Sequence, residues 1–164
     1  MDVNVSPSRH TRSVTIDVRG TPRPQGSMKL HALPNGGTAA RYPPAVYEWR
    51  ARVQQAVADV MQQAADDELH VVELPLTGAV ELRLGFDLVR PRGHYGTGRN
   101  LNILKPSAPK FPDYMPDLDK LVRCVSDAIT DAGLWNDDGQ VCSIVAAKRW
   151  ATPPGVKITV TELR

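Results

Sequence analysis

The stretch from residue 80 to residue 88 limits the fold most tightly, because apolar side chains occupy every second position in it. These positions are held by Val80, Leu82, Leu84, Phe86 and Leu88. A strand with one face buried produces this period of two. The stretch therefore predicts a strand that packs one side against the core. Similar runs at 14–18, 140–148 and 155–163 predict three further strands.

Two other segments repeat their apolar residues at helical spacing. The first runs from Val46 to Ala64, and Pro43 and Pro44 before it suit the first turn of a helix at 45–66. The second runs from Leu118 through Ala132, and Gly133 stands where a C-terminal helix cap is expected. Together the elements predict an α+β domain with two helices packed on a small mixed or antiparallel sheet.

The length of 164 residues suits one domain with one core. We expect residues 1–11 to form a disordered tail and residues 12–164 a single domain. No run of 18 apolar residues exists, and the first ten residues lack the apolar core of a secretory signal, so we expect a cytoplasmic protein without a membrane partner. Cys124 and Cys142 fit neither a disulfide framework nor a zinc site, and both are expected to be core or near-core thiols.

Charge is distributed unevenly, although the net charge is only +2. The loop at 90–115 is rich in Gly and Pro and longer than most connections within a domain. Between residues 90 and 112 it carries no acid and five cations, namely Arg90, Arg92, Arg99, Lys105 and Lys110. Such a loop is either a solvated linker or a functional element, and its charge favours contact with a nucleic-acid backbone.

Seven acids lie between residues 113 and 138, directly after the basic loop. Four of them have a plain structural interpretation. Asp117 fits a helix N-cap, Asp119 fits an i,i+4 pair with Arg123, and Asp137 and Asp138 fit a turn. A helix of about 16 residues is roughly 24 Å long. The turn therefore lies at the far end of the helix, and the chain must return along the next strand to approach Asp117.

If the carboxylates do converge, a hard divalent cation such as Mg²⁺ would relieve their repulsion, because it prefers oxygen ligands. A metal held in this way can activate a water and stabilise charge on a phosphoryl oxygen. The basic loop would neutralise a DNA backbone beside it. The combination favours phosphodiester chemistry over the separate structural interpretations.

The stretch MPDLDKLVRCVSDAITDAGLWNDDGQVCSIVAAKRW at 115–150 resembles the core motif of the RusA family of Holliday junction resolvases. The resemblance covers residues 115–164 well, since the aspartate pair in DLD, the AGLW step and the DDGQV segment occur in the family's order and spacing. The earlier regions match loosely, as a strand, a basic Pro/Gly turn and a helix. It implies a magnesium-dependent endonuclease that acts as a homodimer, binds branched DNA at four-way junctions and makes paired symmetric nicks in recombination and repair.

The resemblance also implies roles for residues of this chain. The family's three essential acids fall on Asp117, Asp119 and Asp138, which would hold Mg²⁺, with Mn²⁺ as a possible substitute. The catalytic lysine of the family falls on Arg123, and Lys120 replaces an asparagine. We expect Arg123 or Lys120 to stabilise the transition state.

Phosphate contacts are expected from cations in the loop and from three others. The predicted DNA-binding residues are Arg23, Lys29, Arg90, Arg92, Arg99, Lys105, Lys110 and Lys148. Asp127 is expected to be structural, and Asp137 either supports the metal indirectly or forms a turn. A non-catalytic junction- or duplex-binding protein is the main alternative, because Arg cannot titrate as a lysine does. A nucleotide-sugar transferase using DLD as a metal motif is disfavoured, because the chain has no nucleotide-binding βαβ pattern.

Overall fold

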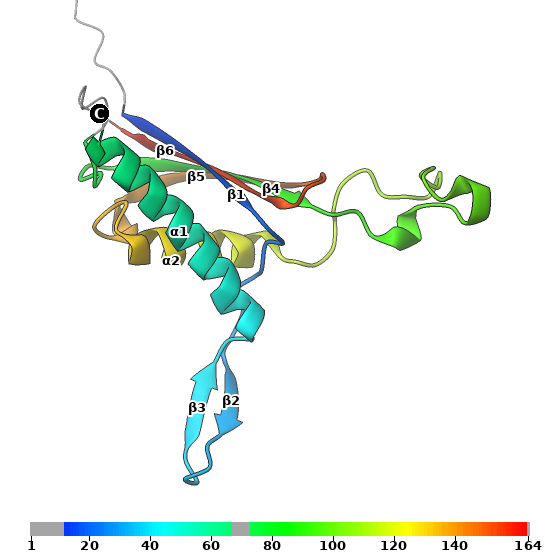
Figure 1. Cartoon of the computed structure of the whole chain (residues 1–164), viewed down its shortest axis with the longest axis horizontal. Helices are drawn as coiled ribbons and strands as arrows, with labels where there is room; N and C mark the ends of the chain where they lie inside the picture. Colours follow the sequence, from blue (N-terminus) through cyan, green and yellow to red (C-terminus); the bar gives the residue numbers. More distant parts are fainter. Residues whose placement is uncertain (1–11, 67–72, 164) are drawn as a thin grey trace, which may run out of the picture.

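The structure is a computed structural model that describes residues 12–66 and 73–163. The tail predicted at 1–11 lies outside these residues. Two helices cover one face of a four-stranded sheet, while a hairpin and a long arm, residues 90–115, project from the body in different directions (Figure 1). In the described part of the chain, no helix is long and apolar enough to cross a membrane.

The sheet is mixed, with the strand order β1-β6-β4-β5. β1 (Ser13–Arg19) and β4 (Val80–Leu88) each pair antiparallel with β6 (Gly155–Glu162), and β4 pairs parallel with β5 (Val141–Trp150). The parallel pair is possible because a long crossover joins the two strands. This crossover contains the arm and α2 (Leu118–Ala132), so β4, α2 and β5 form a βαβ unit whose return strand is an edge of the sheet.

The alternating apolar side chains at 80–88 point into the core as predicted. Val80, Leu82 and Phe86 are fully buried, because α1 (Pro44–Asp66) and α2 pack across the face to which they point. The apolar stripes of the helices supply the other side of the core, where Val53 and Leu121 are also fully buried. Burial of a large aliphatic side chain stabilises the folded chain by about 1.5–3 kcal/mol. The α+β architecture predicted from the sequence is therefore confirmed.

Both ends of the helices follow the sequence signals. Pro44 is the first residue of α1, where its missing N–H costs nothing. Gly133 follows α2 in the left-handed conformation with φ of 78°, and its N–H donates to Thr130 O at 3.0 Å. A residue with a Cβ adopts this φ only with strain, so Gly133 ends the helix and turns the chain toward β5.

A hairpin of β2 (Lys29–Ala32) and β3 (Thr38–Arg41) was not predicted from the sequence. It projects below the body, and its tip is closed by a 2.7 Å bond from Leu33 N to Gly37 O (Figure 1). Nearly all its side chains are exposed, so no buried face imposes an alternating pattern. The prediction for the cysteines was half right, since Cys124 is buried whereas Cys142 is exposed.

Candidate active site

The acid pair lies at the exposed N-terminus of α2. Asp117 occupies the N-cap position, but its side chain accepts no hydrogen bond from the helix, so the predicted capping bond is absent. Its Oδ2 instead accepts a hydrogen bond from the ammonium of Lys120. That bond and the charge of Lys120 lower the pKa of Asp117, and Lys148 adds to the effect. Conversely, the carboxylate of Asp117 raises the pKa of Lys120, with a smaller contribution from Asp119.

Asp119 and Arg123 are exposed on the same helix. No ion pair or hydrogen bond joins their side chains within residues 12–66 and 73–163, so the i,i+4 pair suggested by the sequence is not formed. Both groups face solvent about one helical turn apart. Asp119 is therefore open to an external ligand, beside a second carboxylate that is already ionised.

Three chain segments meet at this end of α2. Lys148, near the end of β5, donates from Nζ to Tyr114 O at 2.6 Å and to Pro116 O at 2.9 Å. The backbone N–H of Gln25 donates to Lys120 O at 2.9 Å. Residues 21–25, the root of the arm and the end of β5 thus hold the acid pair in place. Lys148, predicted as a phosphate contact, also serves to fix this corner.

Asp138 lies at the other end of α2, in the short 3-10 helix η3 (Asp138–Gln140). Asp137 caps η3, since its Oδ1 accepts from Gly139 N at 2.7 Å, so its turn role is confirmed. α2 has 15 residues and is about 22 Å long, with Asp117 at its N-terminal end and Asp138 beyond its C-terminal end. Across the described residues, no group of three His, Cys, Asp or Glu is placed to hold a metal ion.

The expected structural role of Asp127 is confirmed. It accepts a hydrogen bond from the side chain of Gln25, which is 3% exposed, and it lies 3.9 Å from the guanidinium of Arg50. Arg50 also pairs with Asp131 and donates to Gln25 Oε1 at 3.0 Å. This network holds α1 and the segment before β2 against α2. Its acids are not those of the exposed pair, Asp117 and Asp119.

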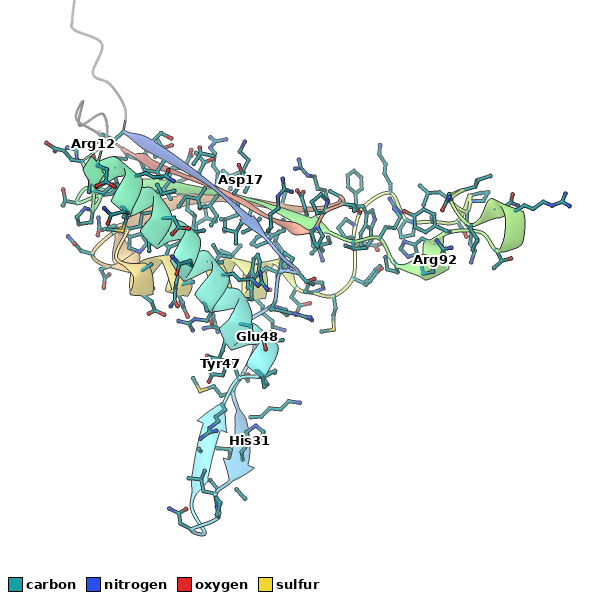
Figure 2. All side chains as sticks on the ribbon, viewed as in Figure 1. Arg12, Asp17, His31, Tyr47, Glu48 and Arg92 are labelled. Atoms are coloured by element: carbon teal, nitrogen blue, oxygen red, sulfur yellow. The ribbon has the colours of Figure 1, made fainter. Side chains whose placement is uncertain are left out.

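The arm carries five of the predicted cations, and Figure 2 shows Arg92 on it, away from the helices. Arg92 donates to Leu101 O at 3.0 Å, and Lys105 donates to Gly93 O at 2.8 Å. These bonds close the outer part of the arm, which contains the turns η1 (Arg92–His94) and η2 (Gly98–Asn100). Arg99 is exposed in η2. The arm is thus an ordered structure stabilised partly by its own basic side chains.

The inner part of the arm is built on an aromatic cluster. Arg90 lies 5.1 Å from the ring centre of Trp150 and donates to Pro109 O at 2.8 Å. Trp150 also contacts the rings of His94 and Tyr114, with centroid distances of 5.5 Å and 5.8 Å. This cluster was not predicted from the sequence. The feature of the sequence that could have indicated the cluster is the presence of aromatic residues among the cations at both ends of the crossover.

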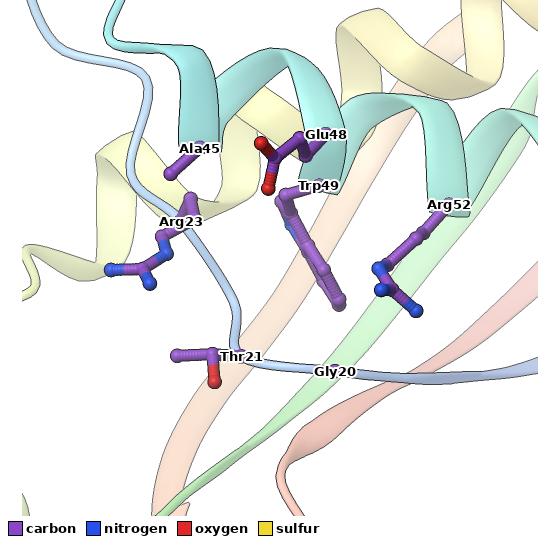
Figure 3. Close-up of a pocket in the computed structure, with 7 residues that line it drawn as sticks. All are labelled: Gly20, Thr21, Arg23, Ala45, Glu48, Trp49 and Arg52. Atoms are coloured by element: carbon purple, nitrogen blue, oxygen red, sulfur yellow. The ribbon is translucent and has the colours of Figure 1, made fainter.

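Three of the predicted cations remain, and each lies at a different place. Lys29 is exposed at the start of β2, and Lys110 lies 5.5 Å from the ring centre of Phe111. Arg23 lines a hollow of about 310 Å³ between residues 20–23 and α1, where Arg23 and Arg52 flank Trp49 on opposite sides (Figure 3). Glu48 also borders this hollow, so its charge is mixed. A second hollow of about 400 Å³ shares Arg23 and reaches Pro116.

A family model for the endodeoxyribonuclease RusA matches residues 19–161, which span both helices, β4, β5 and all of β6 except its last residue, but only Arg19 of β1. The chain belongs to the RusA endodeoxyribonuclease family. No curated protein sequence matches it significantly. Membership of the RusA family implies an endonuclease that resolves Holliday junctions, and it places the exposed acid pair, the corner around it and the basic arm in a DNA-cleaving protein.

Proposed function

We propose that this RusA family member is a magnesium-dependent resolvase that cuts four-way DNA junctions by paired symmetric nicks as a homodimer. The observation that carries the proposal is the position of Asp117 and Asp119. Both lie at the exposed end of α2, beside Lys120 and Lys148 and at the root of an arm whose residues 90–112 carry five cations and no acid. The cations would hold the DNA backbone where the carboxylates can act on it.

The donor set fits a hard divalent cation. Asp117 and Asp119 offer carboxylate oxygens, and the lowered pKa of Asp117 keeps it ionised at neutral pH. When bound, the ion would supply an activated water and neutralise charge at the scissile phosphate. The ammonium of Lys120 pairs with Asp117 Oδ2, so a metal ion would have to compete with Lys120 for that oxygen. Once displaced, Lys120 is free to donate to the phosphate as charge develops in the transition state.

The third expected ligand, Asp138, lies too far from Asp117 to join it within one chain. We propose that Asp138 comes from the second copy of the dimer. β5 is a sheet edge, and Ile144 and Val145 on it are 51% and 48% exposed. If two β5 strands pair antiparallel with Val145 opposite its own copy, the start of one strand lies beside the end of the other.

This pairing sets Val141 of one copy opposite Arg149 of the other, next to Lys148. Lys148 is hydrogen bonded to Pro116, which precedes Asp117. Asp138, three residues before Val141, would therefore approach the acid pair of the opposite copy. Each complete site then needs both chains, and the dimer holds two such sites at the two ends of the paired strands.

Mixing two inactive variants tests the proposal. Asp119→Asn and Asp138→Asn should each be inactive with Mg²⁺ and a labelled four-way junction. In a mixed dimer, one site combines both changes, whereas the other keeps Asp119 from one copy and Asp138 from its partner. Mixing should therefore restore nicking at one strand, which leaves nicked junctions rather than resolved duplexes. A mixture as inactive as its components would contradict the shared site, and an intact protein that binds but never nicks would contradict resolvase activity.

A junction-binding protein without nuclease activity is the second candidate. The observation that favours it is Arg123, which stands one turn after Asp119 where the family's lysine is expected. A guanidinium keeps the positive charge but neither the geometry nor the titratable amine. The same junction assay separates the two candidates, because this one predicts tight binding that Mg²⁺ does not convert into cutting.

A further inference from the structure

The hollow of about 400 Å³ beside the acid pair has the features of a site for a flat aromatic ligand. It lies between residues 21–24, the end of β4, the root of the arm, the start of α2 and the end of β5. We propose that it accepts a nucleobase turned out of the DNA stack next to the scissile phosphate. This inference rests on the proposed function, and it specifies how that site holds its DNA.

The walls of the hollow are flat and largely apolar. Trp150 and Tyr114 provide aromatic rings whose planes are inclined by 47°, and Pro22 and Pro116 line the hollow with them. Leu88, which is 7% exposed, also lines it. Sites for small molecules typically combine such walls with a few polar groups, and a volume of 400 Å³ lies within their usual range of roughly 300–1,000 Å³.

Trp150 is held firmly enough to serve as a stacking surface. Its Nε1 donates to Pro109 O at 3.3 Å, Arg90 lies 5.1 Å from its ring centre, and His94 packs edge-on at 5.5 Å. A ring that is already fixed loses little conformational entropy when a base stacks on it. Stacking on aromatic side chains is the general way in which proteins hold unpaired bases, because every base has a π-face.

The position of the hollow points to DNA rather than to an unrelated small ligand. Pro116 lines it and immediately precedes Asp117, so a base in the hollow belongs to a nucleotide near the reacting phosphate. Arg23 borders it, and Lys148 fixes the backbone of Tyr114 and Pro116. Arg23 is therefore placed to hold the phosphate of the displaced nucleotide, and no acid is among the lining residues.

The test is a double-mutant cycle between the protein and the DNA. A four-way junction is prepared intact and with single abasic nucleotides at each of three positions on either side of the cut. Binding, with the metal removed by EDTA, and the cleavage rate, with Mg²⁺, are measured for the unmodified protein and for Trp150→Ala. Removal of the base that enters the hollow should weaken junction binding by the unmodified protein on the order of tenfold. The same removal should have no further effect on Trp150→Ala.

Three further variants protect the result against a folding defect. Trp150→Phe should keep the coupling, because a phenyl ring still stacks. Thr21→Phe adds a ring at an exposed lining position and should block the hollow without removing a wall. Tyr47→Ala removes an exposed ring from α1, outside the hollow, and should behave as the unmodified protein does.

The outcomes separate this inference from the proposed function. Suppose that the protein cuts junctions, but that each abasic position changes binding by the unmodified protein and by Trp150→Ala equally. The nucleobase site is then wrong, and the proposed nuclease function is kept. If no junction is cut, the proposed resolvase function is wrong. The double-mutant cycle is then measured as binding of a single-stranded oligonucleotide, with and without one abasic nucleotide, to the unmodified protein and to Trp150→Ala. Coupling to Trp150 there supports the hollow as a base site, and its absence overturns it.

Discussion

At the scale of single residues, the state of Asp117 depends on the competition for its carboxylate. Lys120 binds Oδ2 and lowers the pKa of the acid, so Asp117 is ionised but not free. Both side chains are exposed by about two fifths, at 42% for Asp117 and 43% for Lys120. Water and salt screen such a pair, so it contributes little to stability. Its consequence is therefore chemical, because a ligand with higher charge can displace Lys120.

Lys120→Gln should raise the pKa of Asp117 back toward its ordinary value. The folded-state pKa is lowered in the unmodified chain, so the pair stabilises the fold above the unfolded-state pKa of Asp117, and this contribution is lost as pH falls through the lowered value. The variant should therefore lose less stability on acidification. Carboxyl NMR titration of Asp117 measures the shift. An unchanged pKa in the variant would assign the effect to Lys148 instead.

Asp119→Asn and Asp138→Asn should each abolish cleavage, while junction binding is kept or strengthened. An amide cannot replace an ionised ligand, yet its neutrality removes repulsion toward the DNA backbone. Gel shift and nicking assays on the same four-way junction measure both effects. Asp131→Asn, on the far part of α2, is a matched control that changes the charge equally. Near-normal nicking by either of the first two variants would contradict the metal assignment.

Arg123→Ala should lower the cleavage rate, and Arg123→Lys should keep or raise it. The transition state gains negative charge, and Arg123 is an exposed cation one turn from Asp119. Single-turnover rates with Mg²⁺ make the comparison, since they exclude product release. If the alanine variant cuts normally, the stabilising cation is Lys120.

At the scale of elements, the predictable parts of the chain are those with one buried face. The core strand at 80–88 and the helix at 118–132 were predicted with their bounds because burial imposes periods of two and 3.6 residues. The hairpin of β2 and β3 was missed because it has no buried face. Its one local signal is Asn35-Gly36, since Gly36 has φ of 82° and this dipeptide favours hairpin turns.

The site was predictable in its parts but not in its assembly. The sequence indicated that the chain returns beside α2 after residue 138, and β5 does so. However, the residue that this return brings to Asp117 is Lys148, ten positions after Asp138. Spacing along one chain determines which ends of elements meet. It does not reveal which carboxylate a second chain would supply to the proposed shared site.

The arm should contribute most of the salt dependence of binding without changing the chemistry. Arg99 is exposed near its tip and makes no hydrogen bond within the described residues, so Arg99→Ala removes a phosphate contact without opening the arm. The slope of log K against log salt should become shallower by about one unit for each lost contact. Titration of a junction between low and physiological salt measures it. A slope equal to that of the unmodified protein would show that the arm tip does not reach DNA.

At the scale of the whole molecule, the proposed dimer would connect oligomeric state with activity through the edge strand β5. It carries Ile144 and Val145 exposed by about half, on a sheet edge where an unpaired backbone invites another strand. The other edge, β1, turns polar side chains such as Ser13 and Thr15 outward. The apolar edge is therefore the better surface for a self-complementary contact between two copies.

Val145→Lys should convert the dimer into a monomer that remains folded. In an antiparallel pair with position 145 opposite its own copy, the two introduced ammonium groups would lie close together and repel. The residue is exposed in one chain, so its own fold loses no buried contact. Val145→Thr, which keeps a β-branched side chain of similar size, should remain dimeric. Light scattering at micromolar concentration, free and on a junction, distinguishes the two states.

The monomeric variant should also lose cleavage on both strands, although its own Asp117, Asp119 and Asp138 are unchanged. The reason is geometric, because about 22 Å of helix separates Asp138 from the acid pair of the same chain. A monomer with undiminished nicking would mean that two acids suffice in one chain. An unmodified protein that is strictly monomeric, both free and on DNA, would contradict paired cleavage and favour single nicks or binding alone.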